Sequence, residues 1–203
     1  MKNYIKINNQ KIALTDEQIK EIQKSFGVSN VKLDDIAVGE TFKIGKYEFI
    51  VLDKGFNSAA VILKDLLFDE KQFGTNNNYN GSYVDEICNC FAGEIADIIG
   101  DDNLMPCEVD LTADDGLKDY GTIDRKMFLP TANIYRKYVE ILDNYKVDKW
   151  WWLSTAFSTP KHGYEKAVKC VSPSGYVFIN YGYNFSGGVR PFCILNSNIF
   201  VSK

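Results

Sequence analysis

Apolar and polar residues alternate along the chain in short runs that predict strands, interrupted by a few longer runs with helical spacing. Residues 4–14 predict a β-hairpin, and a helix is predicted to begin at Thr15 and to end before Gly27. Thr15 and Gln18 have the spacing of a capping box, in which each side chain bonds the backbone N–H of the other residue. The pattern therefore predicts a small hairpin–helix unit over residues 1–30, which we expect to act as an adaptor.

The middle of the chain combines a meander of strands with two helices. Residues 41–44, 47–53 and 58–64 alternate or run apolar between glycine-containing turns, which is typical of three antiparallel strands. Helices are predicted from Ser82 to Gly100 and from Thr131 to about Asn144, because each begins at a capping residue and repeats apolar residues every three or four positions. Shorter strands are expected over residues 107–112 and 126–129.

The last third of the chain has the pattern of strands throughout. The predicted strands are 150–154, 166–171, 176–181 and 189–195. Strands that come in runs, with helices inserted rather than strictly alternating, indicate an α+β fold with mostly antiparallel pairing. We expect residues 31–203 to form one domain.

Composition supports a packed domain and limits its partners. Hydrophobic residues make up 45% and charged residues 25% of the chain, which is typical of a globular protein. The net charge of −4 argues against a dedicated nucleic-acid-binding protein, whose affinity depends on Lys and Arg contacts to phosphates. The first 20 residues lack the apolar segment of a signal peptide, and no stretch is apolar enough to span a membrane. We therefore expect a cytoplasmic protein with no membrane partner.

Candidate catalytic chemistry is sparse. The single histidine, His162, lies in a loop, and no Gly-x-Ser-x-Gly motif accompanies it. Cys170 and Cys193 lie on predicted strands and could face each other, which leaves a redox or copper role open beside two packed thiols. The acidic residues between 108 and 119 offer oxygen ligands for a hard cation but match no calcium-binding loop. We predict no catalytic residue, no cofactor and no bound metal.

The strongest surface signal is the segment 176–188, in which Tyr and Phe are interleaved with Asn, Ser and Gly. This mixture is typical of binding loops, because rings provide rigid contact area and small polar residues adapt their hydrogen bonds. Phe178 is predicted to point inward, with the later rings near a loop tip. Together with the loop around His162, the predicted binding residues are Ser158, Lys161, His162, Tyr164, Tyr181, Tyr183, Asn184, Phe185 and Ser186.

Five further residues are predicted to be structural. Trp150, Trp151 and Trp152 place large rings on both faces of one strand, so at least one ring must be buried and another half-exposed. Arg190, followed by Pro191, predicts a buried guanidinium that bonds carbonyl groups or an acidic partner, because its forked donors need fixed acceptors.

Several segments resemble an uncharacterised domain family common in Firmicutes and their phages. The segments are Val38-Gly39-Glu40, Glu48-Phe49-Ile50-Val51-Leu52-Asp53, Trp150-Trp151-Trp152-Leu153-Ser154-Thr155, Val171-Ser172-Pro173-Ser174-Gly175 and Gly188-Val189-Arg190-Pro191. The resemblance covers about residues 31–203 and implies a C-type-lectin-like fold, shared with formylglycine-generating enzymes and with variable receptor-binding proteins of phage. It implies a twisted antiparallel sheet with two or three packed helices, in which the Trp strand and the Arg-Pro strand pair.

Two departures limit what the resemblance transfers. The family pattern commonly has Arg where this chain has Ser154, which puts a shared ligand in doubt. Cys170 and Cys193 do not fall in the paired-cysteine copper motif of formylglycine-generating enzymes, so that chemistry is not carried over.

The resulting hypothesis is a non-catalytic binding protein of phage or mobile-element type that binds a protein of the host cell. Composition rich in Lys, Asn and Ile is compatible with the AT-rich genomes of such sources. Inhibition of a host defence complex, as anti-CRISPR proteins perform it, fits this context. The alternatives are a glycan- or receptor-binding lectin-like module, for which loops of aromatic residues and Asn suit sugar rings, and an enzyme on the same scaffold, either a cysteine-dependent oxidase or a hydrolase that uses His162.

Overall fold

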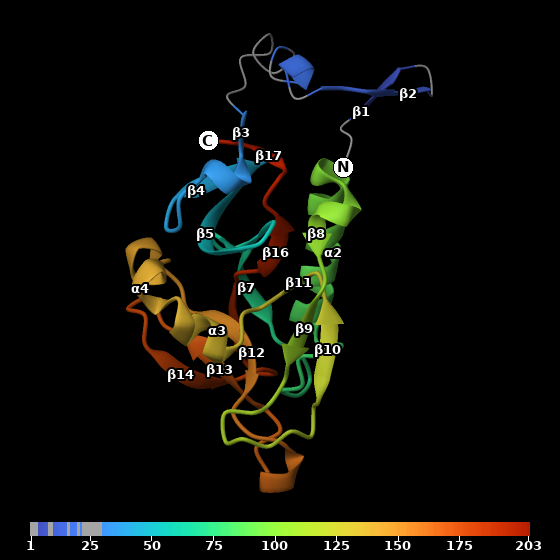
Figure 1. Cartoon of the computed structure of the whole chain (residues 1–203). Coiled ribbons are helices and arrows are strands. Elements are labelled where there is room, and N and C mark those ends of the chain that lie inside the picture. The colour runs from blue at the N-terminus through green and yellow to red at the C-terminus, as the bar shows by residue number, and fades with distance from the viewer. Residues whose placement is uncertain (1–3, 8–9, 16, 20, 22–29) are drawn as a thin grey trace.

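The computed structural model describes residues 4–7, 10–15, 17–19, 21 and 30–203, and within them the chain adopts a mixed α+β fold (Figure 1). Most strands pair antiparallel, in a sheet that curls into a half-barrel and in a second sheet. The two main helices are α2 (Tyr83–Ile99) and α3 (Ala132–Lys137). The predicted α+β class is therefore confirmed. No helix in the described part of the chain has the length and apolar run needed to cross a bilayer.

The curled sheet contains the predicted meander. Its strands are β3 (Asn30–Lys32), β4 (Thr41–Ile44), β5 (Tyr47–Gly55), β6 (Ser58–Leu63), β8 (Leu104–Met105), β11 (Met127–Phe128), β16 (Phe192–Asn196) and β17 (Phe200–Ser202). They follow the order β11-β16-β6-β5-β4-β17-β3, and β8 also pairs with β16. The antiparallel pairs β4–β5 and β5–β6 confirm the three predicted strands.

The second sheet gathers the strands of the last third of the chain. Its order is β14 (Val177–Tyr181), β13 (Ala167–Val171), β12 (Trp151–Ala156), β15 (Ser186–Val189) and β7 (Phe68–Gln72). β12 and β15 lie side by side, with Trp151 opposite Gly188, but they run parallel rather than antiparallel as the resemblance implied. Glycine permits this close approach, because a Cβ atom on Gly187 would overlap the ring of Trp150.

The prediction of one strand over residues 189–195 is wrong. β15 ends at Val189 in the second sheet, and β16 begins at Phe192 in the curled sheet, so the chain crosses between sheets at Arg190 and Pro191. Pro191 has no N–H to donate to a ladder, and the side chain of Arg190 turns into the interior. Because apolar residues flank the crossing on both sides, the hydrophobic pattern reads as one continuous strand.

The helices begin where their caps predict. The side chain of Ser82 accepts from the N–H of Asp85 at the start of α2, and Thr131 accepts from the N–H of Ile134 at the start of α3. The second helix is not continuous to residue 144, as predicted. It breaks at Tyr138, whose hydroxyl donates to Asp53, and resumes as α4 (Val139–Leu142) followed by a 3-10 turn, η3 (Asp143–Tyr145).

An additional hairpin and the N-terminal unit complete the described chain. β9 (Cys107–Asp110) pairs with β10 (Thr122–Arg125), a strand that the sequence did not predict. β1 (Tyr4–Ile7) pairs with β2 (Gln10–Ala13), which confirms the N-terminal hairpin. The capping box is confirmed as well, since Thr15 and Gln18 bond each other's N–H at 3.0 and 3.2 Å. Residues 17–19 and 21 are helical as predicted, and the remaining residues of the predicted helix, 16, 20 and 22–26, lie outside the described residues.

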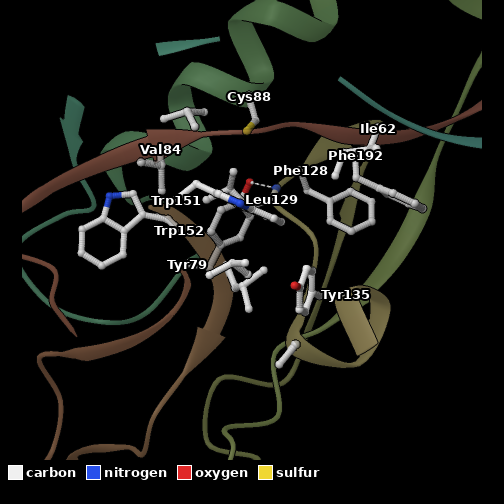
Figure 2. Close-up of a cluster of buried hydrophobic side chains, with 14 of the residues drawn as sticks. Ile62, Tyr79, Val84, Cys88, Phe128, Leu129, Tyr135, Trp151, Trp152 and Phe192 are labelled. Carbon is white, nitrogen blue, oxygen red and sulfur yellow. Dashed lines mark hydrogen bonds between the residues drawn. The ribbon is translucent and has the colours of Figure 1, made fainter. Parts of the chain in front are cut away.

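The core has two parts. Trp151, Trp152, Leu129 and Tyr79 are buried together between the second sheet, α3 and the start of α2 (Figure 2). A separate cluster, which includes Phe49, fills the space between the curled sheet and α2. The second sheet is therefore anchored by tryptophan, and its loops extend from a rigid base.

Candidate functional site

The predicted binding residues lie on two loops of the second sheet, except that Tyr181 is the last residue of β14 and Ser186 the first residue of β15. One loop, residues 157–166, joins β12 to β13 and contains the 3-10 turn η4 (Pro160–His162). The other, residues 182–185, joins β14 to β15. The N–H of Gly182 donates to the carbonyl of Lys166 at 3.0 Å, which ties the two loops together. We call these two loops, together with Tyr181 and Ser186 at the strand ends beside the second loop, the loop end.

Asn77, from the loop before α2, fixes the first of these loops. The side chain is fully buried, and its Nδ2 donates to the carbonyls of Ser158, Tyr164 and Ala167 at 2.8 to 2.9 Å. Its Oδ1 accepts from the hydroxyl of Tyr120 at 2.6 Å. Sequence reasoning missed this residue, because one Asn in an Asn-rich loop carries no signal that distinguishes it from its neighbours.

Acidic residues of the loop between β9 and β10 hold the same segment from the other side. Asp115 accepts from the hydroxyl of Ser158 and lies 2.9 Å from Nδ1 of His162, while Asp119 accepts from Thr159 at 2.9 Å. The hydrogen bond from Ser158 is the main reason that the pKa of Asp115 lies below its ordinary value, because it favours the charged carboxylate. The acidic loop between β9 and β10 thus stabilises the conformation of the first loop of the loop end.

Ser158 must be removed from the predicted contact residues. Only 2% of its surface is exposed, and its hydroxyl is already committed to Asp115. The same geometry also tests the alternative of a hydrolase that uses His162 as its base. A serine nucleophile needs a histidine nitrogen next to its hydroxyl, whereas here Asp115 lies between Ser158 and His162. Ser158 and His162 therefore do not form a nucleophile–base pair.

The remaining predicted residues are exposed. The largest exposed fractions belong to Tyr164 at 53%, Phe185 at 49% and Tyr181 at 48%, followed by Tyr183 at 38%. The exposed polar members are Lys161, His162, Asn184 and Ser186. Tyr181 and Tyr183 meet edge to face with their ring centres 6.3 Å apart. The structure thus brings two of the predicted rings, Tyr181 at the end of β14 and Tyr183 after it, into contact at the surface.

Two lysines lie against aromatic rings of the loop end, Lys166 against the exposed Tyr183 and Lys169 against the half-buried Phe157. The Nζ of Lys166 lies 4.8 Å from the ring centre of Tyr183, in the range of a cation–π contact. Lys169 makes a longer contact of 5.9 Å with Phe157, whose ring packs edge to face on Tyr164. Lys166 therefore places a positive charge beside Tyr183, whereas the charge of Lys169 is balanced by Asp114 at 2.9 Å.

Tryptophans anchor the sheet beneath the loop end. Trp151 and Trp152 are buried, and the Nε1 of Trp152 donates to the carbonyl of Lys71 at 2.8 Å. Trp150 is half-buried and packs edge to face on Trp152 and on Phe178. This arrangement confirms that at least one of the three rings is buried and another half-exposed, and that Phe178 points inward. Both strand faces bury a ring, and the half-exposed Trp150 lies on the same side as Trp152.

Arg190 links the two sheets. Its side chain is buried and donates to the carbonyls of Leu63, Lys64 and Tyr145 at 2.6 to 3.0 Å, which confirms the predicted bonding to carbonyl groups. Burial lowers its pKa to about 10, still far above neutral pH, so the guanidinium keeps its charge. Pro191, also buried, starts the crossing to the curled sheet.

The two strand cysteines do not meet. Cys170 lies on β13 in the second sheet, whereas Cys193 lies on β16 in the curled sheet, and the two belong to different core clusters. Both are free thiols, and burial raises the pKa of each. Among the residues that the structure describes, no three His, Cys, Asp or Glu side chains are grouped to hold a metal ion.

A cleft of about 360 Å³ opens beside the start of α3, and its lining contains none of the predicted binding residues. Its charged lining includes Asp114 and Arg136, which pair at 3.0 Å, and Asp114 also accepts from Lys169 at 2.9 Å. The carboxylate is therefore already balanced by two cations and presents no unbalanced charge to a ligand.

Comparison with known proteins adds no relative: no protein-family model, curated protein or solved structure matches the chain. The resemblance stated from the sequence therefore stays a prediction, and the case for a function depends on the geometry of the loop end.

Proposed function

We propose that this chain is a non-catalytic protein-binding module whose contact surface is the loop end. The observation that carries the proposal is a set of exposed rings, Tyr164, Tyr181, Tyr183 and Phe185. Asn77 holds the backbone of the first loop, and the hydrogen bond from Gly182 to Lys166 ties the second loop to it. Tyr and Phe offer large contact area with few rotamers to freeze, and a fixed backbone lowers the entropy lost on binding.

The partner that best suits this surface is a protein of a bacterial host, and the chain is of phage or mobile-element type. Support for this part comes from the resemblance, from composition and from the adjacency of the Trp strand to the segment before Arg190. The same features support a C-type-lectin-like fold as the finer description of residues 31–203. Inhibition of a host defence complex is the form of activity that this context favours.

A comparative pull-down tests the contact surface. The immobilised chain is exposed to lysates of Firmicute bacteria, and retained proteins are quantified by mass spectrometry for three versions: wild type, the triple variant Tyr181→Ser, Tyr183→Ser, Phe185→Ser, and Phe56→Ser as matched control. Phe56 is 95% exposed on the β5–β6 turn, so it offers a free ring outside the loop end. Serine in each case removes a ring from the surface without touching the core.

The proposal expects at least one protein that wild type and Phe56→Ser retain equally and that the triple variant retains about tenfold less, as loss of contact rings implies. Equal retention by the triple variant would contradict the proposal. A glycan array probed with the same three versions addresses the lectin alternative: binding there that depends on the three rings would replace a protein partner with a sugar.

A further inference from the structure

The second sheet has two edges of different chemistry. β7 forms one edge and carries three charged residues in succession, Asp69, Glu70 and Lys71. β14 forms the other edge and has the sequence VFINY, without a single charge. Proteins commonly protect an edge strand from pairing with other chains by placing charges, proline or a bulge on it. β14 has none of these, and its register with β13 is regular.

The register shows which backbone groups of β14 are open. Ser172 donates to Tyr176 at one end of the β13–β14 pair, and Gly182 donates to Lys166 at the other. Hydrogen-bonded and non-bonded pairs alternate in an antiparallel ladder, so residues 176, 178, 180 and 182 turn their N–H and C=O toward β13. Val177, Ile179 and Tyr181 turn theirs outward.

Two of the three outward residues have free edge groups. The N–H of Tyr181 donates to the side chain of Asn180, and its carbonyl accepts from Asn184 and Phe185, so this residue closes the strand. Val177 and Ile179 are left with two donors and two acceptors. Within the described residues, β13 is the only strand that pairs with β14.

We infer that β14 is a self-association site, where two copies of this chain join their second sheets through antiparallel pairing of β14 with β14. One register satisfies all four open groups: Phe178 lies opposite Phe178 of the second copy, and Val177 of each copy pairs with Ile179 of the other. In that register each Val177–Ile179 pair exchanges two hydrogen bonds.

Side chains and charge favour a second copy as the occupant. The register matches Val with Ile twice on one face and Phe with Phe on the other, pairs that stabilise antiparallel strands. Antiparallel pairing also brings the Tyr181 end of one copy to the Gly175 end of the other. Lys166 borders the first end, where it contacts Tyr183, and the ion pair of Asp143 and Lys146 borders the second, close to Gly175. Because that pair is balanced, it adds no net charge opposite Lys166, and the two uncharged strands bring no like charges together.

The inference goes beyond the proposed function and rests on a different observation, the open edge of β14, although Tyr181 belongs both to the loop end and to β14. Tyr164, Tyr183 and Phe185 lie outside the paired strand, so a dimer would present two loop ends. Two five-residue strands offer a contact smaller than the roughly 1,200 Å² of a stable interface, so we expect weak association in the micromolar range.

Proline at position 179 tests the inference. The N–H of Ile179 points away from β13, so Ile179→Pro leaves the internal ladder intact but removes a donor to the second copy. Ile179→Thr, the matched control, keeps the N–H and the β-branched shape. Sedimentation equilibrium of the full chain over a range of concentrations should show a monomer–dimer equilibrium for wild type and for Ile179→Thr. The dimer of Ile179→Pro should have a dissociation constant at least about tenfold higher.

Hydrogen exchange of the wild type provides a readout that needs no variant. The amides of Val177 and Ile179 should gain protection as protein concentration rises, whereas the amide of Phe178, already bonded within the sheet, should not change. A wild type that stays monomeric at all concentrations would overturn the inference. Association that persists in a folded Ile179→Pro, with a circular dichroism spectrum like that of wild type, would overturn it too. Loss of partner retention in Tyr183→Ser with dimerisation unchanged would separate the two proposals.

Discussion

β12 and β14 flank the same strand, β13, and both are rich in aromatic residues, yet they use them in opposite ways. All six residues of β12 are buried, including Trp151 and Trp152. In β14 every second residue reaches solvent, and Tyr181 is 48% exposed. β12 has a neighbour on each side and packing against both faces, whereas β14 has a neighbour on one side. Position in the sheet, more than residue type, therefore separates a core ring from a contact ring.

The largest expected difference is in stability. Trp152→Ala removes a ring that packs on Phe73 and Trp150 and should lower the free energy of unfolding by about 3–5 kcal/mol. Tyr181→Ala should change it by about 0.5 kcal/mol or less, because half of the side chain already contacts water. Urea denaturation at a fixed protein concentration measures both. Similar losses in the two variants would remove the distinction between the strands.

Asn77 tests whether the loop end is held as firmly as the sheet beneath it. Asn77→Ala leaves buried carbonyls without their donor and should cost about 2 kcal/mol of unfolding free energy. Amide exchange in residues 157–166 should become faster, while the amides of β12 keep their protection. Asn76→Ala is the control, since that side chain is exposed and bonds only the N–H of Asn78. Equal exchange of the loop in both variants would contradict the assigned role of Asn77.

The smallest expected effect is a dependence on pH confined to the loop end. The pKa of Asp115 is lowered in the folded protein by its bond from Ser158, so its contribution to stability is present above its ordinary value of 3.8 and is lost as pH falls through the lower folded value. As pH is lowered, the amides of residues 158–163 should therefore lose protection against hydrogen exchange at a higher pH than the amides of β12. In β12 the side chain of Trp152 is held by a carbonyl, which does not titrate. Asp115→Asn should flatten this difference; if the difference persists, another group controls the loop.

Much of the local structure is predictable because its signals lie within a few residues of each other. Ser82 and Thr131 cap their helices as predicted, and the turns around Gly45 and Asn57 bound the meander. β7 has no such signal, since three charges interrupt its pattern, and it becomes a strand only by pairing with β15. The exposure of Tyr181 and the bonding of Arg190 were also predictable from composition and chemistry. The roles of Ser158 and Asn77 were not, because both depend on partners about 40 or more residues away.

By itself, the sequence determined most of the segments that form strands and helices, where the caps lie and that some rings must remain at the surface, because periodicity and capping act over one or two turns of chain. Tertiary structure alone decided that Arg190 and Pro191 divide two sheets, that β12 and β15 run parallel, and that β14 is left at an edge. A strand takes its hydrogen-bond partners from distant parts of the chain, and hydrophobic periodicity records that a face is buried without recording what buries it.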